Sequence, residues 1–276
     1  MLECPEVTTI AAQMRIVLPG KRVGSGICCA TPHKFAFLNR PTGEYAPFLA
    51  DKRVGTILDD GSRLYLTLEP SWLLMLGEVV GRVLYHPAGA ALPPKHQLLL
   101  QFTDGSALTL TISMWAAIHL LPQDGFADYA PWKNRCPNPL NPAFSWEYFQ
   151  TILSDPTEVA TKSVKRMIVS KPNVHSVGNG CLHDILFRAG LNPRHLVKDL
   201  TLAQQRALYE ATVLTVRLMT DAGGRDCERD LYNRPGGYHG ILGAWAAGQP
   251  CPQCGSIIEK VAYLGGSSYY CPTCQV

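Results

Sequence analysis

Four cysteines near the C-terminal end of the sequence have the spacing of a metal site. They form two Cys-x-x-Cys pairs separated by 16 residues, and they are Cys251, Cys254, Cys271 and Cys274. Four thiolates can surround one Zn²⁺ at about 2.3 Å, and the metal then supplies folding free energy to a segment too short for its own core. Two disulfides or a redox-active pair would use the same residues, but two correctly spaced pairs favour zinc. We therefore predict one structural Zn²⁺, without an open coordination position for catalysis.

The segment between the two cysteine pairs has the pattern of a β-hairpin. Residues 256–263 and 268–270 are rich in β-branched and aromatic side chains, and the turn sequence 264–267 between them contains a Gly-Gly pair. Strand, turn and strand held by a metal make a zinc ribbon. Because a closed four-cysteine site does no chemistry, we expect the metal to hold this hairpin in place for another purpose.

Two carboxylates, Glu3 and Glu6, lie at the other end of the chain. Pro5 suits the first position of a helix, and the apolar residues spaced along 7–17 predict that this helix presents one stripe to a core. Glu6 then lies in the first helical turn, where an acidic side chain complements the helix dipole. Glu3 precedes the helix and is the better candidate for chemistry.

Positive charge is concentrated in one part of the sequence. The whole chain has a net charge of +3, but residues 161–199 contain seven Lys or Arg residues and two Asp residues, a local charge of +5. The glycine-rich loop 223–243 adds arginines, including Arg225. Such a concentration is the footprint of a surface that binds a polyanion, although solvated helix faces produce similar runs.

Composition describes an ordinary globular chain of 276 residues, with 46% hydrophobic and 17% charged residues. Its apolar runs fall short of the ~20 residues of a membrane span, and the N-terminal sequence lacks a signal-peptide layout. The other six of the ten cysteines show no framework spacing. We therefore expect reduced thiols, a cytoplasmic location and no membrane partner.

The elements that must position these residues fall into an α+β pattern. Apolar residues alternate with period two from about 21 to 121, which predicts a β-sandwich or barrel. A stretch rich in proline and asparagine, 122–142, has the composition of a linker. Helices are then predicted at 145–153, from Thr157 to Ile168, at 181–189, and from a capping box at Thr201. We expect domains at 1–130, 131–240 and 241–276.

Three motifs in order resemble one family. They are the opening Glu3-Cys-Pro-Glu6, the stretch Ser176–Pro193, and the terminal Cys-x-x-Cys pairs followed by Gln275. Together they resemble the formamidopyrimidine-DNA glycosylase and endonuclease VIII family of base-excision repair. The resemblance implies an N-terminal β-sandwich with flanking helices, a helix-two-turn-helix domain and a C-terminal zinc ribbon. It also implies a monomer that binds damaged or distorted double-stranded DNA, at the nucleoid if the source is bacterial.

The resemblance assigns contacts to the DNA backbone. In the family, an asparagine and a lysine that match Asn179 and Lys165 grip the backbone around a flipped nucleotide, because a base inside a duplex cannot be reached for chemistry. Asn179 in a simple left-handed cap is the alternative. Arg63 matches a lysine of the sandwich, and Gly266 matches an arginine at the tip of the ribbon. Ser268 and Arg225 complete the predicted DNA-binding residues.

The catalytic positions depart from the family pattern. Members use an N-terminal proline as an amine nucleophile against the sugar, with the first carboxylate as general acid or base; here Leu2 and Glu3 match these positions, and Glu6 matches the second carboxylate. Retention of Met1 would displace the α-amine by about 3.5 Å. We therefore predict a DNA-binding protein whose amine-nucleophile glycosylase and lyase activity is weakened or lost.

Two alternatives stay open at this point. One is an active, monofunctional DNA glycosylase in which Glu3 activates water. The other is a non-enzymatic zinc-ribbon module that binds nucleic acid or protein. The residues that fill the space of a flipped base are also replaced, with Glu78 and Trp115 near the matching positions, and Trp115 is either a substitute wedge or a core residue.

Overall fold

The computed structural model describes residues 1–154, 161–170 and 174–276 of the chain, which form two compact units. Unit 1 comprises residues 1–135 and 223–237, and unit 2 comprises 136–222 and 238–276. The predicted start of a helix at Thr157 lies outside the described residues. The predicted division into three domains stays a prediction.

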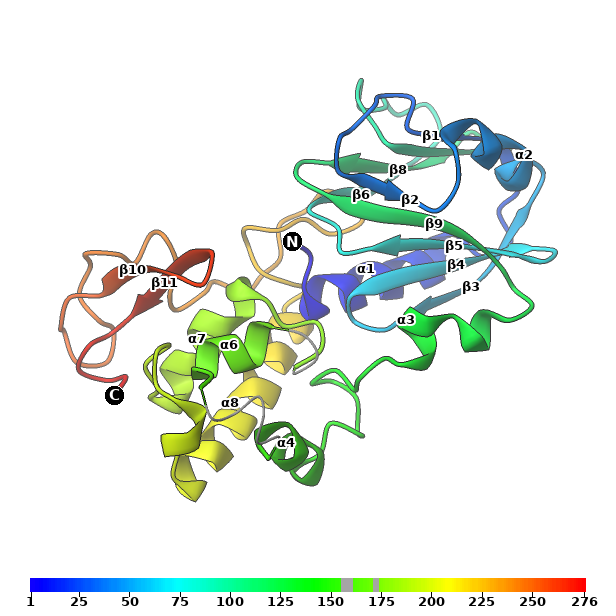
Figure 1. The fold of residues 1–276 in the computed structure, drawn as a ribbon. Coiled ribbons are helices and arrows are strands. Elements are labelled where there is room, and N and C mark those ends of the chain that lie inside the picture. Colours follow the sequence, from blue (N-terminus) through cyan, green and yellow to red (C-terminus); the bar gives the residue numbers. More distant parts are fainter. Residues whose placement is uncertain (155–160, 171–173) are drawn as a thin grey trace. The chain divides into compact units, whose positions relative to one another are not determined.

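Unit 1 is built on two β-sheets (Figure 1). A five-stranded sheet has the order β2-β9-β5-β4-β3, and a four-stranded sheet has the order β1-β7-β8-β6. The strands are β1 (Val23–Cys28), β2 (Ala36–Leu38), β3 (Arg53–Asp59), β4 (Arg63–Glu69), β5 (Trp72–Gly77), β6 (Gly81–His86), β7 (Leu98–Phe102), β8 (Ala107–Ile112) and β9 (Ala116–Pro122). In β4, Leu64, Leu66 and Leu68 join the core, as the period-two pattern predicts.

Helices flank the sheets of unit 1. Helix α1 (Cys4–Val17) begins with Pro5 in its first turn and buries Val7, Ile10 and Met14 against the core that β3 and β4 share. A 3₁₀ turn, η1 (Thr42–Glu44), leads into α2 (Tyr45–Leu49) beside β1. The predicted first helix is thus confirmed.

The first half of the predicted linker is not a linker. Residues 126–128 form the 3₁₀ turn η2 (Phe126–Asp128), and α3 (Ala130–Lys133) follows. Phe126, Tyr129 and Trp132 pack against buried Tyr65 on the sheet. The proline-rich composition suggested a linker. The three aromatic side chains, however, bury enough apolar surface to give this segment a defined structure.

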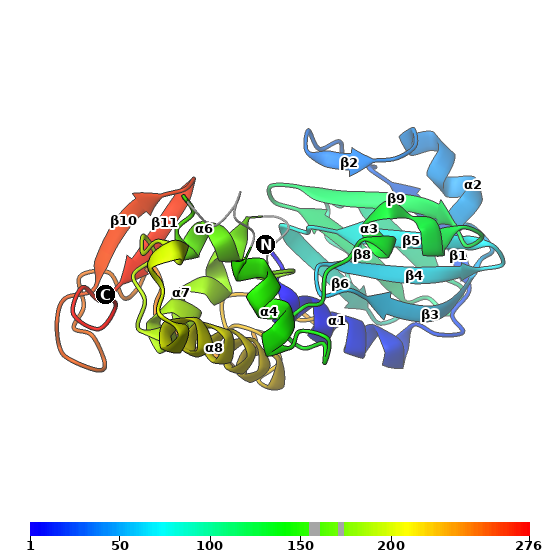
Figure 2. The ribbon, with the colours of Figure 1, turned by 60° about the horizontal axis from the view of Figure 1, so that its bottom comes forward.

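Unit 2 contains the predicted helices and the metal hairpin. Its described helices are α4 (Trp146–Leu153), α6 (Val164–Val169), α7 (Asn179–Ala189), the 3₁₀ turn η3 (Val197–Asp199) and α8 (Leu202–Asp221). Ser145 and Thr201 accept hydrogen bonds at the N-termini of α4 and α8, which confirms both predicted starts. Helix α7 packs against α6 and α8 (Figure 2). The α+β prediction is confirmed, and the described residues include no helix with the length and apolar character of a membrane span.

The hairpin of unit 2 has a tighter turn than the sequence predicted. Strands β10 (Glu259–Tyr263) and β11 (Gly266–Tyr270) pair in register, with Tyr263 opposite Gly266. The turn is therefore Leu264-Gly265, and both residues have positive φ, 52° and 73°. This is the geometry of a type I′ turn, which matches the twist of the strands. The Gly-Gly pair suggested a longer turn, but Gly266 belongs to β11.

Candidate functional site: a metal centre, a helix N-terminus and a buried ion-pair cluster

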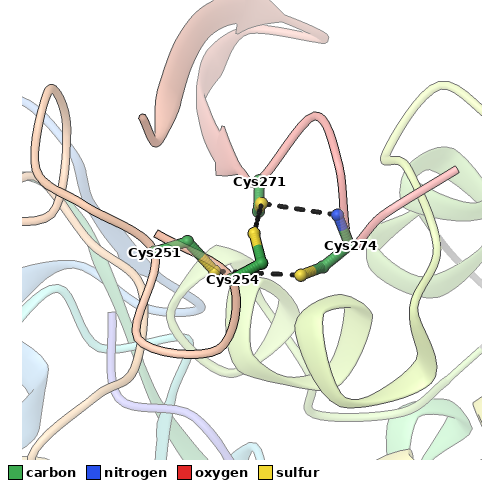
Figure 3. A group of neighbouring side chains, drawn as sticks. All are labelled: Cys251, Cys254, Cys271 and Cys274. Atoms are coloured by element: carbon green, nitrogen blue, oxygen red, sulfur yellow. Dashed lines mark hydrogen bonds between the residues drawn. The ribbon is translucent and has the colours of Figure 1, made fainter. Parts of the chain in front are cut away.

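The four predicted ligands converge on one point (Figure 3). Their sulfur atoms all lie within 4.8 Å of one another, with Cys251 and Cys274 at 3.9 Å and Cys254 and Cys271 at 3.4 Å. A tetrahedron with metal–sulfur bonds of about 2.3 Å has sulfur–sulfur edges of about 3.8 Å. The donor set and its dimensions fit one structural Zn²⁺, as predicted.

The metal centre is attached to helix α7. A small apolar cluster of Leu242, Ile258 and Cys271 packs against Phe187 of α7. The side chain of Gln275 donates from Nε2 to the carbonyl oxygen of Leu191 at 3.0 Å. The metal centre is thus joined to the C-terminal end of α7 by apolar contacts and to the residue Leu191 just beyond it by a hydrogen bond.

Asp184 is a buried residue of this unit to which the sequence analysis gave no role. It lies in the middle of α7, fully buried, and its carboxylate accepts hydrogen bonds from the backbone nitrogens of Ile241 and Leu242 and from the hydroxyl of Tyr238. Burial raises the pKa of Asp184, whereas these donors act in the opposite direction. The sequence did contain a signal for this residue: Asp184 lies on the apolar side of a helix, where a buried carboxylate requires hydrogen-bond donors.

Lys165 connects helix α6 to the hairpin. Its side chain is fully buried, and its Nζ donates to the carbonyl oxygen of Tyr263 at 2.8 Å and to Oγ of Ser268 at 3.0 Å. Burial lowers the pKa of Lys165. Ser268 is also fully buried. The side chains of Lys165 and Ser268 therefore form a hydrogen bond with each other. Their predicted contacts with DNA stay predictions.

Asn179 lies beside the turn of the hairpin. It is exposed and is the first residue of α7, with Gly178 as the extended N-cap, so it lies inside the helix and does not adopt the left-handed cap that was the alternative. A Cβ atom added to Gly266 would lie 3.4 Å from Nδ2 of Asn179. His183, one turn further along α7, forms a hydrogen bond of 3.2 Å with the carbonyl oxygen of Ser267. The structure thus brings Asn179 and Gly266 together.

Three of the predicted residues form a buried cluster in unit 1. Glu3 caps α1, and its backbone nitrogen donates to Oε2 of Glu6 at 3.0 Å. Arg225 donates from Nε to Oε1 and from Nη2 to Oε2 of Glu6, both at 2.9 Å, and from Nη1 to Glu3 at 3.4 Å. All three side chains are less than 10% exposed. The Arg225 guanidinium forms hydrogen bonds with two carboxylates here, and its predicted contact with DNA stays a prediction.

Leu2 lies next to this cluster. Its side chain is 4% exposed and belongs to the apolar core of unit 1. Its backbone nitrogen donates to the carbonyl oxygen of Val79 at 2.9 Å. While Met1 remains attached, this nitrogen is an amide whose lone pair is delocalised into the carbonyl group, so it is not nucleophilic.

Arg63 is the last predicted site residue of unit 1. Its Nη1 donates to Oδ2 of Asp60 at 3.1 Å, and its Nη2 lies 3.6 Å from Oε1 of Glu78. The guanidinium is largely buried between these carboxylates. Its predicted contact with a phosphate stays a prediction.

Comparison with protein families matches the C-terminal part of the chain. Residues 248–276 match the family model described as a zinc finger found in FPG and IleRS. This range contains the four cysteines and the hairpin. The match supports the assignment of the cysteines as one structural zinc site.

Comparison with curated proteins covers the whole chain. The chain is 27% identical over 280 residues to formamidopyrimidine-DNA glycosylase from Geobacillus kaustophilus, covering 100% of both proteins. It is 26% identical over 283 residues to the protein of the same name from Chloroflexus aggregans, covering 100% of this chain and 99% of that protein.

Solved structures show the same fold. The Lactococcus lactis Fpg in complex with DNA that contains an abasic site has a TM-score of 0.83 at 18% identity, with 99% of each chain covered. The MutM (Fpg) protein from Thermus thermophilus has a TM-score of 0.81 at 21% identity, with 99% of this chain and 98% of that chain covered.

Proposed function

Because this chain belongs to the formamidopyrimidine-DNA glycosylase family, we propose that it binds damaged or distorted duplex DNA, with amine-nucleophile excision weakened or lost. The family acts in DNA repair and has a C-terminal zinc finger. A cytoplasmic location, at the nucleoid if the source is bacterial, is part of the same proposal.

The observation that best supports DNA binding is that Asn179 lies beside the turn of the zinc hairpin. The N-terminus of α7 carries the positive end of the helix dipole, which favours a phosphate. The exposed Nδ2 of Asn179 adds a donor, and the Gly266 backbone lies beside it without a side chain to block an approaching phosphate. This arrangement suits contacts that position a duplex without reading its sequence.

The buried Lys165 supports this site indirectly. By donating to both Tyr263 and Ser268, it fixes the last residue before the turn and the middle of β11 to helix α6. The ammonium group therefore holds the hairpin at its turn, and the zinc ligands lie at the opposite end of the same hairpin. We propose that Lys165 positions the hairpin, so that the phosphate site is formed before DNA arrives.

The loss of amine chemistry follows from the position of Leu2. An amine nucleophile needs a lone pair aimed at the sugar. With Met1 retained, as we propose, the Leu2 nitrogen is an amide that donates to the carbonyl oxygen of Val79. Catalytic groups tolerate about 0.5 Å of misplacement, and the next nitrogen, that of Met1, is one residue away. Glu3 and Glu6 are occupied by the α1 cap and by Arg225, which favours a structural role for both carboxylates.

Incubation with a labelled duplex that contains an abasic site and with sodium borohydride tests the proposal. We expect a salt-dependent complex in fluorescence anisotropy and no covalent adduct in a denaturing gel. An adduct would show that an amine still attacks the sugar, against the proposed loss of activity. In a second duplex that contains an oxidised base, excision of that base without an adduct would favour activation of water by Glu3. Absence of binding at low salt would contradict the proposal as a whole.

A further inference from the structure

Two adjacent cysteines lie at the end of β1. Cys28 is the last residue of the strand and pairs with Leu98 of β7, and the backbone nitrogen of Cys29 donates to the carbonyl oxygen of Gln97 at 2.6 Å. Cys28 is 5% exposed, whereas Cys29 is only partly buried. The backbone therefore fixes both residues, and one residue of the pair is accessible from solvent.

The side chains of Cys28 and Cys29 lie on the same side of the chain. Successive residues of a regular strand point to opposite faces of the sheet. Cys29, however, has a φ of 53°, in the left-handed region that costs a residue with a side chain about 1–2 kcal/mol. Both cysteines pack against the same apolar core, and their thiols form a hydrogen bond with each other. The backbone conformation thus brings together two sulfur atoms that a regular strand would separate.

Both thiols of this pair keep their protons at neutral pH. Burial raises the pKa of Cys28 and of Cys29 above the ordinary value of a cysteine. Because the thiolate is the form that attacks alkylating reagents and binds metal cations, the pair reacts slowly with both. It suits a ligand that removes the protons of the thiols itself.

We propose that Cys28 and Cys29 form a binding site for trivalent arsenic. Sulfur ligands prefer soft elements such as arsenic(III), and once one thiol is bound the neighbouring thiol attaches at a high effective concentration. With an arsenic(III) oxide such as phenylarsine oxide, two S–H bonds and the bonding between arsenic and oxygen break, and two arsenic–sulfur bonds form. The oxygen takes both protons and leaves as water, so the reaction needs no oxidant or reductant.

The other cysteines differ from this pair. The four cysteines of the hairpin fit one Zn²⁺, which occupies their thiolates when it is bound. Cys4 and Cys181 are fully buried. Cys136 and Cys227 are more accessible, but neither is adjacent to another cysteine in the sequence. In the zinc-loaded protein, we therefore expect one chelated arsenic per chain.

Native mass spectrometry of the zinc-loaded protein with equimolar phenylarsine oxide tests the inference. We expect a single adduct that retains zinc, and dithiothreitol should remove it, whereas 2-mercaptoethanol at the same thiol concentration should not. Cys29→Gly should lose the adduct. Glycine adopts the left-handed conformation without strain, so this variant should keep the fold, which circular dichroism and zinc content verify. Cys227→Ser, at an exposed single cysteine, is the matched control and should keep the adduct.

Three outcomes would overturn the inference. One is the absence of an adduct with the unchanged protein, and another is an adduct of unchanged yield in Cys29→Gly. The third is release of zinc on addition of the arsenical, because the reagent would then occupy the cysteines of the hairpin. The proposed function does not depend on these outcomes, since neither Cys28 nor Cys29 is proposed to contact DNA.

Discussion

Arg225 and Glu6 form a two-point ion pair in the interior of unit 1, although 219 residues separate them in the sequence. Both oxygens of the Glu6 carboxylate accept from the guanidinium at 2.9 Å, and Oε1 also accepts from the backbone nitrogen of Arg225 at 3.1 Å. The pair joins residues 223–237 to α1. It therefore explains why this segment belongs to unit 1 and not to the helical unit that precedes it.

The first prediction concerns the stability that this pair provides. Arg225→Met leaves two buried carboxylates without their cation, which should lower the free energy of unfolding by about 3–5 kcal/mol. Urea unfolding measures the loss. Arg206→Ala, which removes an exposed pair with Glu210, is the control and should change stability by about 1 kcal/mol or less. Equal small effects of both substitutions would contradict a structural role for Arg225.

The second prediction concerns the turn of the zinc hairpin. Leu264 adopts a left-handed backbone conformation, which costs a leucine about 1–2 kcal/mol and which asparagine adopts more easily. Leu264→Asn should therefore slow hydrogen exchange of the β10 and β11 amides, whereas Gly265→Ala should accelerate it. If Leu264→Asn accelerated exchange, the type I′ assignment of the turn would be wrong.

The third prediction concerns the pH dependence of stability. Burial, aided by the positive charge of Arg63, lowers the pKa of His119, which forms a hydrogen bond with the hydroxyl of Tyr129. Below the ordinary pKa of about 6.5, the unfolded chain binds a proton that the folded state excludes, so the free energy of unfolding falls as pH decreases. Burial lowers the pKa of His86 as well, which adds a loss in the same direction.

His119→Gln should reduce this loss of stability. Urea unfolding between pH 8 and pH 5 should give a shallower decline for the variant than for the unchanged protein, while the two curves should run parallel above pH 8. A steeper decline in the variant would mean that His119 gains protons on folding, against its burial in β9.

The fourth prediction concerns the cation that the family resemblance places at the ribbon tip. Gly266→Arg would place a guanidinium next to Asn179, where a phosphate is proposed to bind. Duplex affinity at low salt should rise, and the slope of log affinity against log salt should become more negative by about 0.9 for the added contact. Gly43→Arg adds the same charge at an open glycine of unit 1 and should leave the slope nearly unchanged. Equal slopes for both variants would contradict the proposed phosphate site.

Local signals predicted much of this molecule from sequence. Pro5, Ser145 and the Thr201 capping box mark helix starts through contacts within one turn, and the cysteine spacing defines the metal centre. The sequence could not predict contacts between side chains that are distant along the chain. Lys165 and Ser268 are 103 residues apart, and no sequence signal predicted the hydrogen bond between their buried side chains. The sequence around a charged residue does not show whether its side chain faces solvent or forms a buried ion pair or hydrogen bond.

The central claim is that the N-terminus of α7, beside the zinc-held turn, binds the backbone of duplex DNA. Titration of a labelled duplex with an abasic site against Asn179→Ala, over a range of salt concentrations, tests it most directly. We predict about 10- to 100-fold weaker binding at every salt concentration, because a hydrogen bond to a charged phosphate is lost, with an unchanged salt slope, because asparagine carries no charge. Asn134→Ala, at an exposed asparagine of unit 1, should bind like the unchanged protein. Equal affinities of the Asn179→Ala and Asn134→Ala variants would contradict the account.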